Sequence, residues 1–158
     1  MVINIPQQVN RAIDILEKNG HSAYVVGGAV RDAIMKKPAH DWDITTSALP
    51  EETMDAFEGF RIIETGLKHG TVTVIVDGTD LEITTYRIEH GYSDNRHPDK
   101  VDFTDRVEDD LSRRDFTVNA IAYSPVRGFA DPFGGRDDIE KKVIRCVGDA
   151  EKRFSEDA

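Results

Sequence analysis

The sequence has little cysteine, no long apolar run and no excess of positive charge. Its one cysteine, Cys146, cannot form a disulfide within the chain, which excludes a disulfide-stapled secreted domain and makes a cytoplasmic setting the expectation. No stretch approaches the roughly 18 apolar residues of a membrane helix, and the first residues lack the pattern of a signal peptide. We therefore expect no membrane partner.

Positive charge is scarce, because 20 Lys and Arg residues face 30 Asp and Glu residues and the formal net charge is −10. Lys and Arg supply most non-specific affinity for a phosphate backbone, so this chain is not expected to bind nucleic acid strongly by itself. It could still act on an RNA end if a basic surface were supplied elsewhere. The length of 158 residues and the 39% hydrophobic content fit one folded domain or a piece of a larger one.

Several common nucleotide and hydrolase signatures are also absent. The pair Gly27-Gly28 has no third glycine at Rossmann spacing, and the sequence contains neither the Gly-Lys-Ser/Thr of a Walker A motif nor a Gly-x-Ser-x-Gly segment. The histidines are scattered without metal-ligand spacing, which argues against a phosphohydrolase built on His40-Asp41.

Apolar periodicity and chain breakers predict a mixed α/β fold. A helix is expected after Pro6 and should end at Asn19-Gly20. The next expected elements are a strand at 23–26, a helix at 29–35, a strand at 41–45 and a helix at 50–57. Alternating runs at 71–76 and 80–87 flank Asp77-Gly78, which predicts an antiparallel hairpin and hence a partly antiparallel sheet.

The second half of the chain is less periodic. Residues 88–107 are rich in turn formers and charges, and we expect a long mobile loop there. The segment 108–122 opens with acids, as helices often do, and places Arg113-Arg114 one turn later. A helix at 137–142, an apolar strand at 143–147 and a further helix from Asp149 complete the prediction.

Candidate metal ligands come from two predicted strands. Alternate residues of a strand share a face, so Asp41 and Asp43 should project together while Trp42 turns into the core. Carboxylate oxygens of this kind bind Mg²⁺, and a pair of such ions supports phosphoryl-type transfer. Glu82 occupies the polar face of its own strand, opposite Leu81 and Ile83, and is a third candidate carboxylate.

Candidate phosphate-binding groups lie beside these acids in the sequence. Gly27 and Gly28 form a turn without side chains between a predicted strand and helix, where backbone N–H groups can approach phosphate oxygens. Arg31, one turn into that helix, adds a forked cation. Taken singly, each feature also fits a solvated turn, a tight turn, an exposed strand glutamate or a surface salt-bridge pair.

The order of these segments resembles the head of the class II tRNA nucleotidyltransferases, a family that includes CCA-adding enzymes and bacterial poly(A) polymerases. The resemblance spans about residues 21–157 and rests on five segments: Gly27-Gly-Ala-Val-Arg-Asp32, Asp41-Trp-Asp43, Leu81-Glu-Ile-Thr-Thr-Tyr-Arg87, Glu108-Asp-Asp-Leu-Ser-Arg-Arg-Asp-Phe-Thr-Val-Asn-Ala120 and Asp131-Pro-Phe-Gly-Gly135. It implies a polymerase β-like nucleotidyltransferase head over residues 1–147, of α/β (α+β) class with a mixed sheet flanked by helices. Residues 148–158 would begin a helical neck.

The same resemblance implies roles for particular residues. Asp41 and Asp43 match the family's metal carboxylates, and Glu82 matches its third carboxylate. Seven further positions match residues that bind or border the nucleotide in the family: Gly27, Gly28, Arg31, Arg113, Arg114, Asp115 and Asn119. The implied reaction is Mg²⁺-dependent attack of the tRNA 3′-hydroxyl on the α-phosphate of CTP or ATP, with release of pyrophosphate.

The sequence departs from the family pattern at its end. The family continues with Glu-Asp-x-x-Arg, whose Asp and Arg read the base; here Glu156 and Asp157 are present, and the sequence stops at Ala158 before any Arg. Loss of a charged hydrogen-bonding partner such as this Arg costs about 1.5–3 kcal/mol, so we expect weak discrimination between C and A. We also expect the chain to be a truncated piece of a longer protein. A poly(A) polymerase, an enzyme adding only CC or only A, and a catalytically silent nucleotide-binding module remain as alternatives.

Overall fold

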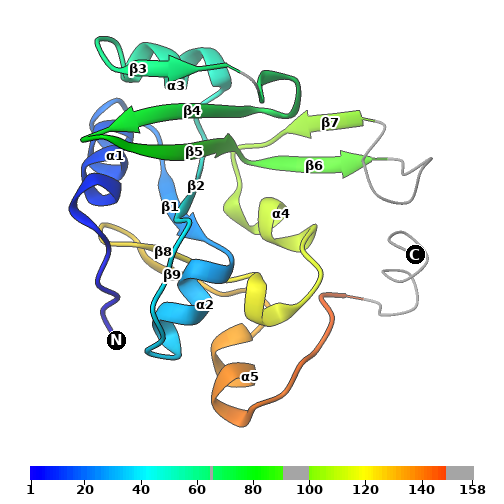
Figure 1. The fold of residues 1–158 in the computed structure, drawn as a ribbon. Helices are drawn as coiled ribbons and strands as arrows, with labels where there is room; N and C mark the ends of the chain where they lie inside the picture. The colour runs from blue at the N-terminus through cyan, green and yellow to red at the C-terminus, as the bar shows by residue number, and fades with distance from the viewer. Residues whose placement is uncertain (65, 91–99, 149–158) are drawn as a thin grey trace.

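The structure, a computed structural model, describes residues 1–64, 66–90 and 100–148. Its centre is a mixed seven-stranded sheet with the strand order β3-β4-β5-β2-β1-β8-β9 (Figure 1). In this sheet β2 and β5 are parallel, and the other neighbouring strands are antiparallel. The strands are β1 (Ala23–Val26), β2 (Asp43–Thr46), β3 (Arg61–Ile63), β4 (Thr71–Val76), β5 (Thr79–Thr85), β8 (Ala122–Ser124) and β9 (Gly128–Ala130).

Five α-helices and two short 3-10 helices surround the sheet in the described part of the chain. The helices are α1 (Gln7–Lys18), α2 (Gly28–Ile34), α3 (Pro50–Ala56), α4 (Val107–Ser112) and α5 (Gly135–Lys141), and the 3-10 turns are η1 (Leu67–His69) and η2 (Thr117–Asn119). None of the described helices is long and apolar enough to cross a membrane. The predicted α/β class with a mixed, partly antiparallel sheet is confirmed.

The predicted hairpin is present as β4 and β5. Val76 pairs with Thr79, and the turn residues Asp77 and Gly78 both have positive φ, of 50° and 79°. Positive φ at both central residues is the geometry that matches the right-handed twist of the flanking strands. Local turn chemistry was therefore sufficient to predict this part of the sheet.

The expected loop at 88–107 is partly wrong. Strands β6 (Arg87–His90) and β7 (Lys100–Phe103) form a separate antiparallel pair, in which Arg87 faces Phe103. Each strand has four residues, too few for alternation to stand out from the sequence. Residues 91–99, which the prediction also covered, lie outside the described residues.

The predicted strand at 143–147 is also wrong. Val143 and Ile144 are exposed, and Cys146 forms an isolated bridge with Phe116. The backbone of this segment instead contacts the start of η2, because Thr117 N–H donates to Arg145 O at 2.9 Å. The helix predicted from Asp149 lies beyond the described residues.

The two faces of the sheet support two unequal cores. The larger core joins α1, α2 and α3 to strand residues that include Val25, Ile44 and Ile83. The smaller core lies on the opposite face and joins Val26 and Ala122 to α4 through Leu111. Because strand side chains alternate, a residue next to a core residue on β2 or β5 faces the other side.

Candidate functional site

Asp43 and Glu82 lie side by side on the face opposite the larger core. Ile44 pairs with Ile83 in the parallel β2–β5 ladder, and Asp43 and Glu82 are each one residue earlier on their strands. The same step places both side chains on the same face, and both are exposed. The sheet register therefore brings together two of the predicted carboxylates, from positions 39 residues apart.

The backbone at Asp41 differs from the prediction. Strand β2 begins at Asp43, and Asp41 precedes it with a left-handed φ of 54°. Asp tolerates this conformation better than most residues. Asp41 still contributes to the electrostatics of Asp43, so the two carboxylates are neighbours, but a shared strand does not align them.

The charge balance at Asp43 is unfavourable for a carboxylate without a cation. Surrounding protein removes hydration and raises the pKa of Asp43; Glu82 raises it further, Arg114 opposes the change, and Asp41 adds to it. A raised carboxyl pKa means that the ionised form is disfavoured in the folded protein. A bound divalent cation would relieve this repulsion.

The donor chemistry fits Mg²⁺ without a preformed protein cage. In the ranges that the structure describes, no group of three His, Cys, Asp or Glu residues is arranged to hold a metal. Mg²⁺ commonly uses one or two carboxylates and takes its remaining ligands from waters and substrate phosphates. Asp43 with Glu82 or Asp41 supplies such a partial set.

The glycine turn lies directly against the carboxylates and two arginines. Val26, the last residue of β1, pairs with Asp43, and Gly27 follows it with φ 83° and ψ −147°. This backbone region is essentially restricted to glycine. A Cβ at Gly27 would lie 3.6 Å from Arg114 Nη1, and one at Gly28 would lie 3.5 Å from Arg31 Nη2.

Arg31 extends from α2 across to η2. Its Nη1 donates to Asn119 Oδ1 at 2.8 Å, and its Nε donates to Asp32 Oδ1 at 3.1 Å. The first contact joins residues 88 positions apart. The structure thus brings Gly28, Arg31 and Asn119 together.

Arg113 and Arg114 follow α4 and share one buried carboxylate, Asp110. Arg113 Nε donates to Asp110 Oδ1 and Arg114 Nη2 donates to Oδ2, each at 3.4 Å. The backbone N–H of Arg87 donates to the same side chain at 3.2 Å. Sequence reasoning missed Asp110 and treated it as one of several acids at a helix start; its spacing of three and four residues before the arginines was the available signal.

Arg114 has unused hydrogen-bonding capacity beside the glycine turn. Burial, and then the charge of Arg113, lowers its pKa, which indicates an incompletely compensated cation. Its Nε is buried and has no hydrogen-bond partner among the described residues, and the same is true of Thr45 Oγ1, two residues along β2 from Asp43. Buried polar atoms are normally paired, so these atoms suit a polar ligand or ordered water at the site.

Asp115, another predicted site residue, contacts backbone groups next to it and in the segment before Gly148. Asp115 is exposed, and its Oδ1 accepts from the backbone N–H of Phe116 at 2.7 Å. Its backbone oxygen accepts from Val147 N–H at 2.8 Å, so the residue helps to hold the segment before Gly148. Asp157 lies outside the described residues.

Comparison with known proteins identifies relatives of the chain. The family model of the poly A polymerase head domain matches residues 23–145. The CCA-adding enzyme of Lactobacillus delbrueckii subsp. bulgaricus is 48% identical over 99% of this chain and 40% of its own length. The CCA-adding enzyme of Geobacillus thermodenitrificans is 50% identical over 96% of this chain and 37% of its own length. This chain therefore spans about two fifths of the curated relatives that it matches.

Solved structures show the same similarity. The CCA-adding enzyme of Bacillus stearothermophilus in complex with CTP has a TM-score of 0.84 and 46% identity, over 96% of this chain and 35% of that one. A tRNA-processing enzyme with CTP has a TM-score of 0.70 and 29% identity, over 92% of this chain and 37% of that one.

Proposed function

Because the chain belongs to the poly A polymerase head domain family, we propose that it binds CTP and ATP and adds their nucleotides to the 3′ end of tRNA without a nucleic-acid template. The relatives named CCA-adding enzymes, which are 48% and 50% identical to this chain, support CCA addition over the other reactions of the family. We assign residues 1–147 to the catalytic head unit and residues 148–158 to the start of a following helical unit.

The carboxylates serve as the cation site in this proposal. Asp41, Asp43 and Glu82 would hold Mg²⁺, which when bound supplies positive charge for an attacking and a leaving oxygen. Loss of hydration, and then repulsion from Glu82, raises the pKa of Asp43, and a bound cation would stabilise its ionised form. The residues thereby contribute placement and charge, which are the main requirements of phosphoryl-type transfer.

The glycine turn and the arginines serve as the triphosphate site. At Gly27 and Gly28 no side chain separates the backbone from a ligand, and the guanidinium groups of Arg114 and Arg31 lie beside them. Guanidinium groups pair well with phosphate oxygens because their N–H donors form a planar fork. Asn119 and Asp110 hold these two arginines in place.

The chemical step joins RNA to nucleotide at phosphorus. The 3′-hydroxyl oxygen of the RNA forms a bond to the α-phosphorus of CTP or ATP, and its proton passes to water. The bond between the α-phosphorus and the oxygen that bridges it to the β-phosphate breaks, and pyrophosphate leaves. The cationic groups near the glycine turn would stabilise the negative charge that builds on the pyrophosphate.

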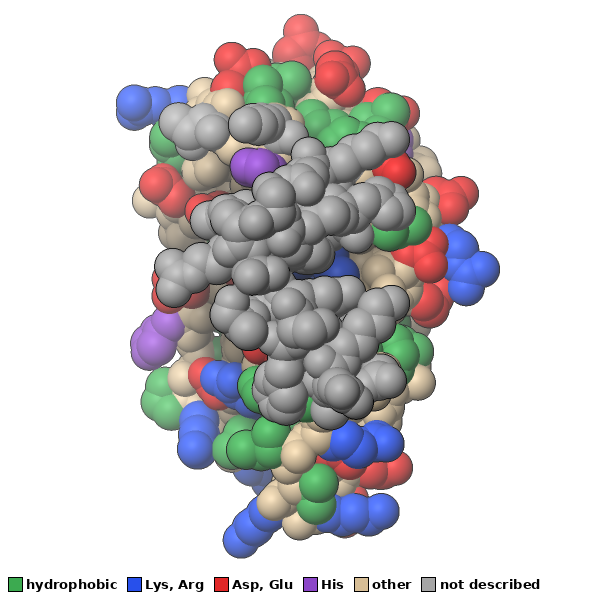
Figure 2. Space-filling model, turned by 90° about the vertical axis from the view of Figure 1, so that its right-hand side faces the viewer, with side chains coloured by type: hydrophobic (Ala, Val, Ile, Leu, Met, Phe, Trp, Pro, Cys, Tyr) green, Lys and Arg blue, Asp and Glu red, His purple; other side chains and the backbone are tan. Residues whose placement is uncertain are grey.

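The tRNA would be held mainly by regions outside this chain. The net charge of −10 disfavours tight RNA binding by the chain itself. The charge is unevenly spread, because acidic side chains gather at the upper end of the face in Figure 2 and basic ones toward its lower end. The lower end, where α5 lies in Figure 1, is the more suitable side for an approaching phosphate backbone.

The observation that supports this function most directly is the β2–β5 register, which sets Asp43 beside Glu82 next to the glycine turn. Calorimetric titration of the chain with CTP and ATP in Mg²⁺ tests nucleotide binding, and extension of a tRNA that lacks its terminal nucleotides tests transfer. We expect saturable, Mg²⁺-dependent binding of both nucleotides, which Asp43→Asn should weaken by about 100-fold or more.

Asp80→Asn is the matched control for this experiment. It removes one negative charge from an exposed position on β5, two residues from Glu82, and should leave binding unchanged. Binding without extension would favour a nucleotide-binding module, and a long product made from ATP alone would favour a poly(A) polymerase. No binding of either nucleotide at millimolar concentration would contradict the proposal.

A further inference from the structure

Trp42 separates the two carboxylates that we assign to the cation and points away from them. Asp43 is exposed on the site face of the sheet, whereas Trp42 is half-buried and packs against the larger core on the other side. The indole of Trp42 therefore packs on the core side of the sheet, whereas Asp43, the next residue, faces the candidate cation site.

The backbone around Trp42 has little other support. Residues 38–42 belong to no helix or strand, and within the described part of the chain no turn or loop hydrogen bond between backbone groups ties them. Asp41 has the left-handed φ of 54°, and the ladder with β1 begins at Asp43. Packing of the Trp42 side chain against the larger core is therefore a contact that can fix the position of Asp41 relative to Asp43.

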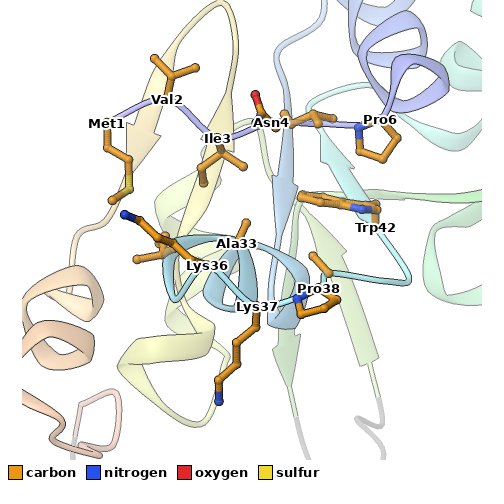
Figure 3. Close-up of a pocket in the computed structure, with 13 residues that line it drawn as sticks. Met1, Val2, Ile3, Asn4, Pro6, Ala33, Lys36, Lys37, Pro38 and Trp42 are labelled. Atoms are coloured by element: carbon orange, nitrogen blue, oxygen red, sulfur yellow. The ribbon is translucent and has the colours of Figure 1, made fainter.

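One side of the indole faces open space. Trp42 is at one end of a pocket of about 780 Å³ between the N-terminal segment and the end of α2, near Pro6 and Pro38 (Figure 3). A smaller side chain at position 42 would enlarge the void on this side and would lose packing against the larger core. The segment could then shift toward the pocket.

We infer that Trp42 is a positioning residue that holds Asp41 and Asp43 at the separation needed to bind one divalent cation. Like charges on Asp41, Asp43 and Glu82 repel one another before the cation arrives, and packing of the indole resists this repulsion. Displacement of a catalytic group by about 1 Å can cost roughly 100-fold in rate, so a modest shift of this peptide would matter. The inference rests on the proposed function, which assigns these acids to a cation.

Binding of Mn²⁺ to the chain, followed by the electron paramagnetic resonance signal of the free ion, tests this inference with and without CTP. Trp42→Ala should weaken Mn²⁺ binding by about tenfold or more, and Trp42→Phe should keep it within about threefold because the ring still packs. If Trp42→Ala does not fold, Trp42→Leu takes its place with the same expected direction.

Ile34→Ala is the matched control. Ile34 also lines the pocket and packs against the larger core, but it does not border the acids. It should lower the urea midpoint while leaving Mn²⁺ affinity unchanged. In the unmutated chain, emission from the single tryptophan should change when Mg²⁺ and CTP are added, and Asp43→Asn should abolish that change.

The outcomes separate this inference from the proposed function. Wild-type Mn²⁺ affinity in a folded Trp42→Ala chain would overturn the positioning role alone. Mn²⁺ binding that depends on Asp43 and Trp42, without binding of CTP or ATP, would support the positioning role and overturn the proposed function. A wild-type chain that binds no Mn²⁺ would overturn both.

Discussion

Two carboxylates in different regions of this molecule have opposite environments. Asp43, at the start of β2, has a raised pKa because it loses hydration and faces Glu82 and Asp41. Asp138, in α5, has a lowered pKa because Thr117 and Arg145 donate hydrogen bonds to it, against some effect of burial. The negative charge of Asp43 is not balanced by its neighbours, whereas that of Asp138 is stabilised by hydrogen bonds within the fold.

The difference separates a group that serves the fold from a group that is available to a ligand. Asp138 joins α5 to η2 and to the segment after α5, and its charge is satisfied by those contacts. Asp43 shares a face with Thr45, whose buried hydroxyl has no partner among the described residues. Strained electrostatics and unpaired polar atoms at one place are typical of functional sites.

Substitution of Asp43 should have the largest effect on nucleotide binding and should not lower the stability of the fold. Asp43→Asn should weaken Mg²⁺-dependent CTP binding by about 100-fold or more, because it removes a charge that serves the cation. The urea midpoint should stay the same or rise, because the substitution also removes repulsion from Glu82. Calorimetry and urea unfolding at pH 7 measure the two quantities. A large fall in stability would assign Asp43 to the fold instead.

Arg114→Ala should give the next largest effect. A lost hydrogen bond to a charged group costs about 1.5–3 kcal/mol, so CTP and ATP should bind roughly 10- to 150-fold more weakly. In an active enzyme this would appear as a raised KM more than as a lost fold. Arg127→Ala removes a comparable cation, paired with Glu17 away from the glycine turn, and should leave binding intact. Equal loss in both variants would point to general electrostatics.

Gly27→Ala should have a smaller effect, of about 1–3 kcal/mol, on both stability and nucleotide binding. The cost comes from the backbone, since the added Cβ would meet Arg114 Nη1 at an ordinary 3.6 Å. Gly128→Ala introduces a residue at a similar φ of 78° with open space around it. It should lower the thermal midpoint without changing CTP affinity, which differential scanning calorimetry and titration can establish. An unchanged affinity in Gly27→Ala would argue against the phosphate-binding turn.

The smallest expected effect concerns Asp138 and pH. Its pKa is lowered from 3.8 in the folded chain, so its contribution to stability is present above pH 3.8 and disappears as pH falls through the lower folded value. Urea midpoints of wild type and Asp138→Asn should therefore differ at pH 5 to 7 and converge as the pH falls below the lowered folded pKa. Mg²⁺-dependent CTP binding at pH 7 should be the same for both. A gap that persists at the lowest pH would mean that packing, and not charge, explains the difference.

The sequence by itself determined features that depend on near neighbours. Apolar spacing placed α1, the Asp77-Gly78 pair placed the β4–β5 hairpin, and the glycine pair marked the turn after β1. It also supplied the acids and arginines of the candidate site, through the resemblance to a family. These features follow from side-chain periodicity and turn chemistry within a few residues.

Only the tertiary structure decided how distant segments meet. It set β2 parallel to β5 so that Asp43 meets Glu82, paired Arg31 with Asn119, buried Asp110 under two arginines and paired β6 with β7. It also showed that Asp41 precedes its strand and that Trp42, between the two acids, packs against the larger core. Such contacts depend on how whole elements pack against one another, and local spacing in a single chain does not specify that packing.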